Sequence, residues 1–596
     1  MKEKAHWPLP SCLVSAALLL ASCSPSPETT TLTNTTVSST SLPAVVPGQT
    51  IASAEKPEYG GTLTLYSLAG IGVFDPVATG MFMGPVGFLI NEQYVAEDWT
   101  RGAAGTGEIE WVPNTGASPD TCTGVLAESW KMPTIGTVVF TVRRGVHWAL
   151  NPNSEASRLM NGREVTADDW IASFRYLMQH PRSMIRTSAP QLVSTATTEK
   201  TGPWEVTVKT PVDPLVGWGW LAWGAAMYFL LPPEVVNRYG DMRDWRNVVG
   251  TGPFMLTDYV DGSSATLARN SNYWQTDPIG PGNGNRLPYL DGIKFLVIPD
   301  ISTAQAALRA ARVDAAFGVT AEDAKSLMRS IPNLKNRSYL PLNPAVIAMR
   351  MDKAELPYKD KRVRQALMMA TDFNALKNDF FGSDAEILAF PITRESKRAY
   401  LSLEEMPASV RALYRYDPEQ ARQLLAEAGY PDGFSCRMIV PSGFGYEDQA
   451  SVYRAMWAKV AVDLEVQPKI LSVFNSIAYA RSYEDMMLFF ATGATQYPGC
   501  LSLGFFGGSF YVNDSMIEAG RQEIQKHVII DMPGADRIYR ELLPYIVEQA
   551  YFIPRPSPRF YSLWWPWLKN FYGEMPGRFG AYHWIDQDLK QEMKGR

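Results

Sequence analysis

The stretch Thr137-Val138-Val139-Phe140-Thr141-Val142 alternates as a β-strand does, with one apolar face made of Val138, Phe140 and Val142. A turn at Arg144-Gly145 follows it. Thr166-Ala167-Asp168-Asp169 predicts the start of a helix, because a hydroxyl residue is followed three positions later by a carboxylate. Behind this start, apolar residues recur at helical spacing and are expected to face a core: Trp170, Phe174, Leu177 and Met178.

The same mixture of strands and helices continues on both sides of this unit. Residues 61–66 alternate as a strand does, and residues 434–440 form a further strand. Residues 362–373 carry apolar side chains on one helical face. Residues 417–420, Asp-Pro-Glu-Gln, are a strong helix start, and Gly429 is placed to end that helix. Because helices and strands interleave without an internal repeat, the predicted class is α/β.

Length and composition indicate a large globular protein. The chain has 596 residues, more than one ordinary core accommodates, so two or three lobes are expected. Its hydrophobic content of 46% and charged content of 19% are typical of a globular fold. The formal net charge is −6, and Lys and Arg are scattered along the chain. A nucleic-acid partner is not expected, because such binding needs a basic patch that replaces counterions on phosphates.

Residues 1–23 have the pattern of an export signal. Two lysines precede an apolar run from Leu13 to Ala21, which at roughly ten residues suits a signal peptide and is short for a membrane span. Small residues before Cys23 resemble a lipobox, so we expect Cys23 to be lipidated and to become the mature N-terminus. A simple signal with a chance cysteine is the alternative. Thiol-linked and amide-linked lipid together would supply stable anchoring.

Residues 24–55 predict a tether, because they are rich in Ser, Thr, Pro and Ala and hold almost no large apolar residue. No later segment approaches 18 uncharged apolar residues, so the body of the protein is expected to be soluble. We therefore expect an exported lipoprotein, anchored in the periplasm or at the outer face of the cell envelope. The sequence leaves open whether the inner or the outer membrane holds it.

Patterns typical of catalysis and of metal binding are missing from the sequence. The histidines beyond the signal show neither metal spacing nor a His-Glu-x-x-His pattern: His147, His180, His527 and His583. There is no Gly-x-Ser-x-Gly elbow. At most one disulfide can form among the remaining cysteines, which lack metal-ligand spacing: Cys122, Cys436 and Cys500. No catalytic residue, metal or cofactor is expected, and a secreted glycoside hydrolase with two distant carboxylates is a distant alternative.

Several short blocks occur in a fixed order: Leu126–Trp130, Val142–Trp148, Val165–Asp169, Val249–Phe254, Arg269-Asn270, Tyr273-Trp274, Pro288–Asp291, Lys361–Ala366 and Leu424–Gly433. Behind a lipobox, these blocks resemble the family 5 extracellular solute-binding proteins, the oligopeptide-, dipeptide- and nickel-binding components of ABC importers. The resemblance implies an α/β, two-lobed periplasmic-binding-protein type II-like fold with an extra inserted subdomain. It also implies a binding protein and not an enzyme.

The architecture of this family implies approximate lobe limits. Lobe I is expected to combine residues 56–100, 226–318 and 546–596, with a subdomain inserted at residues 101–225. Lobe II is expected at residues 319–545. The ligand would lie between the lobes, and closure of a hinge over it would be the signal that a membrane permease senses.

The resemblance is weakest where a ligand would bind. Peptide-binding members carry an "ADYxDP"-like run whose first Asp pairs with the amino terminus of the peptide. The corresponding stretch here is residues 494–500, in which Gln496 takes the place of that Asp and Tyr497 follows it. A neutral amide cannot balance a buried ammonium group. The ligand lacks a free amino terminus at this point, or another carboxylate serves, or the stretch corresponds differently.

The other ligand-binding candidates are aromatic: Phe82, Trp218, Trp220 and Tyr446. Phe82 lies in a loop that faces the cleft in this family, the two tryptophans lie at an expected lobe boundary, and Tyr446 follows a predicted strand. Each could instead be a packing residue. As a group near a cleft they would suit stacking on sugar rings or lining pockets for side chains.

The expected function is therefore that of a monomeric receptor, anchored to the membrane by its N-terminal lipid. It would capture a peptide or peptide-like solute and deliver it to an ABC permease driven by ATPase subunits. Backbone groups would supply much of the hydrogen bonding and so tolerate different ligands. An oligosaccharide receptor of the same fold is the main alternative, favoured by the many aromatic residues and by Gln496. A receptor for nickel or a metal chelate is less favoured, because no His cluster supports it.

Overall fold

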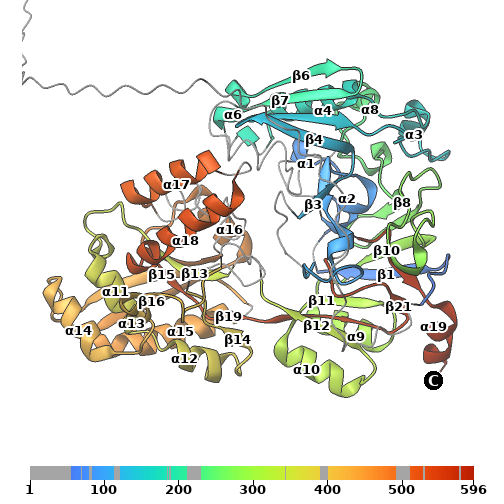
Figure 1. Ribbon diagram of the computed structural model, residues 1–596. Helices are drawn as coiled ribbons and strands as arrows, with labels where there is room; N and C mark the ends of the chain where they lie inside the picture. Colours follow the sequence, from blue (N-terminus) through green and yellow to red (C-terminus); the bar gives the residue numbers. More distant parts are fainter. Residues whose placement is uncertain are drawn as a thin grey trace, which may run out of the picture. The chain divides into compact units, whose positions relative to one another are not determined.

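A computed structural model describes the following residues, all within the compact unit Ala54–Arg596: 55–68, 70–79, 84–112, 121–183, 185–186, 190–210, 230–341, 344–389, 400–443, 445–490, 511–527, 531–575, 577 and 579–595. Two large hydrophobic cores organise this unit. The first core collects buried residues from Leu63 to Leu334 and from Leu563 to Ile585. The second core collects buried residues from Ala345 to Ile553. The chain therefore passes once from the first core to the second and once back (Figure 1).

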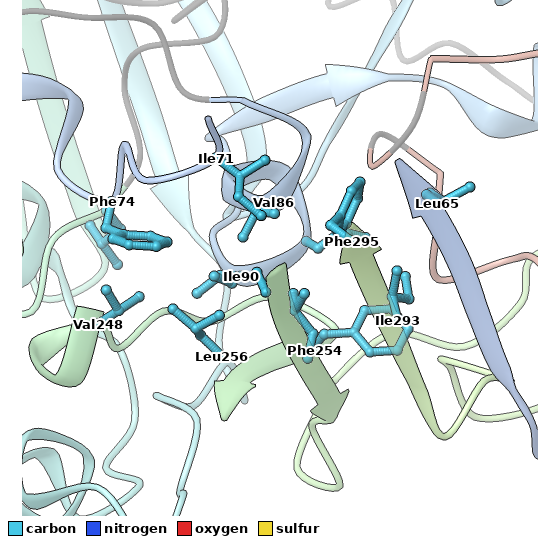
Figure 2. Close-up of a cluster of buried hydrophobic side chains, with 14 of the residues drawn as sticks. Leu65, Ile71, Phe74, Val86, Ile90, Val248, Phe254, Leu256, Ile293 and Phe295 are labelled. Atoms are coloured by element: carbon cyan, nitrogen blue, oxygen red, sulfur yellow. The ribbon is translucent and has the colours of Figure 1, made fainter. Parts of the chain in front are cut away.

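A four-stranded sheet in the order β1-β10-β9-β8 lies in the first core. β1 (Thr62–Ser67) pairs in parallel with β10 (Gly292–Val297). β9 (Ser264–Arg269) and β8 (Phe254–Val260) extend the sheet in antiparallel fashion. Apolar side chains of β8 and β10 gather on the side of α2 (Pro85–Ile90), as Figure 2 shows for Phe254, Leu256, Ile293 and Phe295. The strand expected near residues 61–66 is confirmed.

A second sheet of four antiparallel strands follows the order β4-β5-β7-β6. Its members are β4 (Ala127–Thr134), β5 (Thr137–Val142), β7 (Glu205–Lys209) and β6 (Thr197–Gly202). α4 (Ala167–Gln179) packs with this sheet in the first core. The strand predicted at residues 137–142 therefore has the predicted bounds.

The helix start predicted at residue 166 is confirmed as well. The N–H of Thr166 donates to Asp169 Oδ2 at 2.8 Å, which completes a capping box for α4. Trp170 is fully buried on this helix, and the ring of Tyr94 stacks on it at a centroid distance of 3.9 Å. The apolar stripe read from the sequence thus faces the core.

The second core surrounds a five-stranded sheet in the order β16-β15-β17-β13-β18. The strands are β13 (Ala345–Met349), β15 (Phe434–Pro441), β16 (Val462–Lys469), β17 (Met486–Phe490) and β18 (Phe552–Pro554). β15 runs parallel to β16 and β17, whereas β13 is antiparallel to both of its neighbours. The strand predicted at residues 434–440 is confirmed as β15.

Helices of the second core include α11 (Lys361–Met369), α14 (Pro418–Glu427), α15 (Tyr446–Trp457), α17 (Ser515–His527) and α18 (Met532–Glu548). α14 begins at the predicted cap. The remaining α-helices of the described residues are α1 (Pro76–Thr79), α3 (Glu155–Met160), α6 (Pro190–Thr195), α8 (Pro233–Tyr239), α9 (Ile301–Arg309), α10 (Ala321–Ser330), α12 (Phe373–Ala375), α13 (Ala408–Leu413), α16 (Leu471–Ala480) and α19 (Gln587–Lys594).

The helix predicted over residues 362–373 ends earlier than expected. α11 stops at Met369, whose carbonyl oxygen accepts a hydrogen bond from the N–H of Asp417. Asp372 then caps the short helix α12 by accepting from the N–H of Ala375 at 2.9 Å. A local cap and a contact from a distant segment therefore divide the predicted helix in two.

The two crossings between the cores are joined by hydrogen bonds. β11 (Ala315–Thr320), β20 (Phe560–Trp564) and β12 (Lys335–Tyr339) form a three-stranded sheet with β20 in the middle. β12 belongs to the outgoing crossing and β20 to the returning one, and they pair antiparallel along their full lengths. Short pairs complete the strands: β2 (Val95–Glu97) with β3 (Cys122–Gly124), β14 (Ala385–Glu386) with β19 (Ser557–Pro558), and β21 (Leu568–Lys569) with β22 (Trp584–Ile585).

Candidate functional site

One of the predicted ligand-binding residues, Tyr446, lies within the described residues. The others lie outside them: Phe82, Trp218, Trp220, Gln496 and Tyr497. The predicted lipidation site, Cys23, is outside them too. For these six residues the sequence-based assignments stay predictions.

Tyr446 is the first residue of α15, directly after the turn that follows β15. Gly445 in this turn has a φ of 73°, a left-handed conformation that glycine adopts without steric penalty. The Tyr446 side chain is half-buried and packs against the second core. Burial raises the pKa of its phenol, and the positive charge of Arg555 opposes this rise. Tyr446 is thus partly a packing residue and partly a neighbour of a cation.

Arg555 lies on the returning crossing, immediately after β18. The carbon atom at the centre of its guanidinium group lies 5.2 Å from the ring centroid of Tyr446 and 5.2 Å from that of Phe381. Two aromatic rings therefore hold one cation by cation–π attraction. Its Nε atom is buried and, among the described residues, has no hydrogen-bond partner.

The neighbouring cation on the same crossing is paired. Arg559 forms an ion pair with Glu386, and Lys325 pairs with Asp384 at 3.2 Å. Within the described ranges no carboxylate forms an ion pair with Arg555. Sequence reasoning missed Arg555 and Phe381, because they lie more than sixty positions from Tyr446 in opposite directions. The available signal was a single cation placed between Pro554 and Pro556 after an apolar strand.

A second candidate site is a cavity of about 310 Å³, whose buried rings belong to two small hydrophobic clusters that contain Tyr273 and Trp99. Its wall includes the β2–β3 pair, the segment at residues 273–278 and the segment at residues 579–582. Three carboxylate residues contribute to this wall: Glu92, Glu97 and Asp98. Aromatic side chains supply much of the rest, namely Phe88, Trp99, Tyr273, Trp274, Phe579 and Tyr582.

Glu92 is the most deeply buried of these carboxylates, with 6% of its surface exposed. Its Oε1 accepts hydrogen bonds from the Tyr273 hydroxyl at 3.0 Å, from Trp274 Nε1 at 3.0 Å and from Gln275 Nε2 at 3.3 Å. Burial raises the pKa of the Glu92 carboxyl to about 7, although hydrogen bonds from Trp274, Thr251 and Tyr273 and the charge of Arg143 act to lower it. The group therefore titrates near neutral pH.

Glycine fixes the position of Glu92 relative to the sheet. A Cβ atom on Gly250 would lie 2.1 Å from the carbonyl oxygen of Ile90, and the N–H of Gly252 donates to that same oxygen at 2.8 Å. Only glycine allows this approach, which explains the Gly-Thr-Gly block read from the sequence. The segment that follows α2 is thereby held where Glu92 meets residues 273–275.

Arg143 lies behind the cavity. Its guanidinium carbon is 4.5 Å from the ring centroid of Trp274, and its Nη2 donates to the carbonyl oxygen of Gly124 at 3.0 Å. On the other side, the rings of Trp99 and Tyr582 stack at 4.8 Å with an interplanar angle of 9°. The Tyr582 hydroxyl donates to Gln275 Oε1 at 3.2 Å. A chain of contacts thus links Glu92 to the stacked rings.

Residues 121–506 match the model of the bacterial extracellular solute-binding proteins, family 5, middle part. This match covers more than half of the chain. The chain belongs to this family. The blocks quoted from the sequence therefore marked the family correctly.

Two curated relatives of this family 5 protein illustrate the match. It is 32% identical over 220 residues to heme-binding protein A of Haemophilus influenzae, covering 36% of this chain and 36% of that protein. It is 27% identical over 278 residues to the oligopeptide-binding protein AppA of Bacillus subtilis, covering 46% of this chain and 47% of AppA. The matched parts thus span less than half of these relatives, which are binding proteins by name.

A solved structure agrees with the fold of the family 5 protein. The structure of AppA from Bacillus subtilis in complex with a nonapeptide superimposes with a TM-score of 0.64 at 19% identity, covering 89% of this chain and 100% of that one. At this identity the likeness establishes the fold alone. The two-lobed α/β fold expected from the sequence is confirmed, and the lobe limits stay a prediction.

Three further observations concern the described part of the family 5 protein. No helix there combines the length and the apolar character that crossing a membrane requires. Across the same ranges, no group of three or more His, Cys, Asp and Glu residues is arranged to hold a metal ion. Cys122 on β3 and Cys436 on β15 are not joined by a disulfide, and Cys500 lies outside the described residues.

Proposed function

We propose that this family 5 protein is the substrate-binding lipoprotein of an ABC importer. It captures a peptide or peptide-like solute between two lobes and delivers it to a membrane permease with ATPase subunits. It acts as a monomer, lipid-anchored through Cys23 in the periplasm or at the outer face of the cell envelope, and catalyses no reaction. Family membership supports the binding role, and the two paired crossings at β12 and β20 suit a hinge.

The surroundings of Arg555 support a peptide as the ligand. Its guanidinium carbon lies 5.2 Å from the ring centroids of both Tyr446 and Phe381, its Nε has no hydrogen-bond partner among the described residues, and no carboxylate there forms an ion pair with it. A half-buried cation of this kind is stabilised by a charge-assisted hydrogen bond to an anion. The carboxylate at the end of a peptide supplies such an anion, so Arg555 is proposed to bind it.

A comparison of peptides with altered ends tests this role. We would measure the thermal stability of the protein with a peptide library whose members carry a free or an amidated carboxyl terminus. Ligand bound to the native state alone stabilises it by about 2.7 kcal/mol at a hundredfold excess over the dissociation constant. Peptides with a free carboxylate should stabilise the protein, and their amidated forms should do so much less.

Two variants test whether Arg555 causes the preference for a free carboxylate. Arg555→Gln should abolish the preference for a free carboxylate, whereas Arg559→Lys on the same crossing should retain it, because Arg559 already pairs with Glu386. Stabilisation by oligosaccharides in place of peptides would favour the oligosaccharide-receptor alternative. Consumption of a glycan or peptide with release of product would refute the receptor proposal.

Anchoring is tested separately. The mature protein should carry lipid on Cys23, detectable by mass spectrometry of the N-terminal peptide, and Cys23→Ser should release the protein from membranes. An N-terminal peptide without lipid would show that residues 1–23 are an ordinary signal.

A further inference from the structure

The cavity beside Glu92 goes beyond the proposed function, because its buried rings belong to two small clusters apart from the second core, on which Tyr446 packs beside Arg555. The described residues that line it include the carboxylate residues Glu92, Glu97 and Asp98 and no Lys, Arg or His. The wall therefore favours a positively charged occupant. The adjoining Arg143 is turned to the backbone, since it donates to the carbonyl oxygens of Gly124 and Val125.

The aromatic part of the wall narrows the kind of cation. Trp99, Trp274, Phe579 and Tyr582 contribute aromatic side chains to the wall, and aromatic rings attract cations and exclude water. Such rings do not coordinate Ca²⁺ or Mg²⁺, which take six or more oxygen ligands. A volume of about 310 Å³ lies at the small end of the range for ligand cavities. The cavity thus suits a small organic cation more than a metal ion.

Glu92 is positioned to meet the charge of such a cation. Three donors on one side, from residues 273–275, hold its carboxylate in place. An ionised carboxylate offers about four acceptor positions, so positions on Oε2 remain beside the one that Trp274 Nε1 uses at 3.1 Å. A prearranged carboxylate loses little entropy when it binds a ligand, which favours affinity.

We propose that the cavity binds a small organic ammonium cation, with Glu92 as its carboxylate partner and the surrounding rings as its apolar wall. This would be a second ligand site on the protein, in addition to the solute site. It requires neither the importer role nor the assignment of Arg555.

The protonation state of Glu92 gives this proposal a pH signature. The charged and titratable groups that face Glu92 are Tyr273 from the segment after β9, Arg143 after the end of β5, and Tyr582. Glu97 and Asp98 lie in the same cavity wall. Glu92, with a pKa raised by burial to about 7, changes charge between pH 6 and pH 8. Cation binding should be about tenfold weaker at pH 6 than at pH 8, because a cation prefers the ionised form.

Titration calorimetry on the whole chain, with defined probes, tests the proposal. Tetramethylammonium and n-butylammonium are the cationic probes, and tert-butanol is the neutral probe. We expect saturable binding of at least one cation, about tenfold weaker at pH 6 than at pH 8, and no comparable binding of the neutral probe. Absence of saturable binding by both cations, or equal binding of the neutral probe, would overturn the proposal.

Variants separate Glu92 from a general charge effect. Glu92→Gln keeps the shape of the side chain and should weaken cation binding more than tenfold. Glu574→Gln removes another buried carboxylate that does not line the cavity and should leave binding unchanged. Should Glu92→Gln fail to fold, the pH dependence of cation binding by the unmodified protein still tests the role of Glu92. Unchanged binding in a folded Glu92→Gln variant, or no pH dependence, would contradict the role of Glu92.

Discussion

Replacing Glu92 by Gln should change how the stability of the protein depends on pH. Burial raises the pKa of this carboxyl from 4.5 to about 7 in the folded state. The folded state therefore prefers the protonated form, and its stability falls as pH rises from the unfolded pKa through the folded one. A shift of about 2.5 units corresponds to roughly 3 kcal/mol at about 1.4 kcal/mol per unit. This loss should be complete by about pH 8.

Urea unfolding of the unmodified protein and of Glu92→Gln, measured from pH 4 to pH 8, shows the effect. The free energy of unfolding of the variant, minus that of the unmodified protein, should rise by about 3 kcal/mol over this range. Glu574, 3% exposed and with a pKa raised by burial to about 8, provides a second case. Glu574→Gln should show a rise that extends to higher pH. A difference that stays constant with pH would refute the reasoning for either residue.

Three other substitutions test packing and charge. Arg163→Gln should lower the free energy of unfolding by about 3 kcal/mol, because the carboxylate of Asp169, 2% exposed, loses its ion pair. Urea unfolding measures this loss, and a loss below about 1 kcal/mol would contradict the prediction. Gly433→Ala should prevent folding or lower the melting temperature far more than Gly429→Ala does, because a Cβ atom at residue 433 would lie 1.8 Å from a carbonyl oxygen. Equal melting temperatures of the two variants would refute this prediction. Trp567→Phe should lower the free energy of unfolding by about 2 kcal/mol, since the indole N–H of Trp567 donates to a buried carboxylate at 2.8 Å. An unchanged melting temperature of the variant would contradict this prediction.

Local patterns predicted much of the fold. The strand at residues 137–142 and the capping box of α4 depend on side chains within four residues of one another, and both have the expected form. Gly429, with a φ of 96°, follows α14 as expected for a terminating glycine. The early end of α11 could not be predicted, because Asp417 meets it from a segment almost fifty positions away.

The candidate sites were harder to predict for the same physical reason. Glu92 gains its raised pKa from burial beneath segments about 180 positions along the chain, and a single carboxylate between Asn91 and Gln93 gives no hint of that burial. Tyr446 was predicted as a ligand residue, but its partners Arg555 and Phe381 come from two other segments. Sequence spacing records contacts within an element, whereas these sites arise from contacts between elements.

Identification of the ligand that the protein retains tests the central claim most directly. The chain would be exported, purified without denaturation and then denatured, and the released small molecules identified by mass spectrometry. The account predicts stoichiometric retention of peptides or peptide-like molecules with a free carboxylate, lost in Arg555→Gln. Retained sugars, or a processed product accompanied by consumption of substrate, would contradict it.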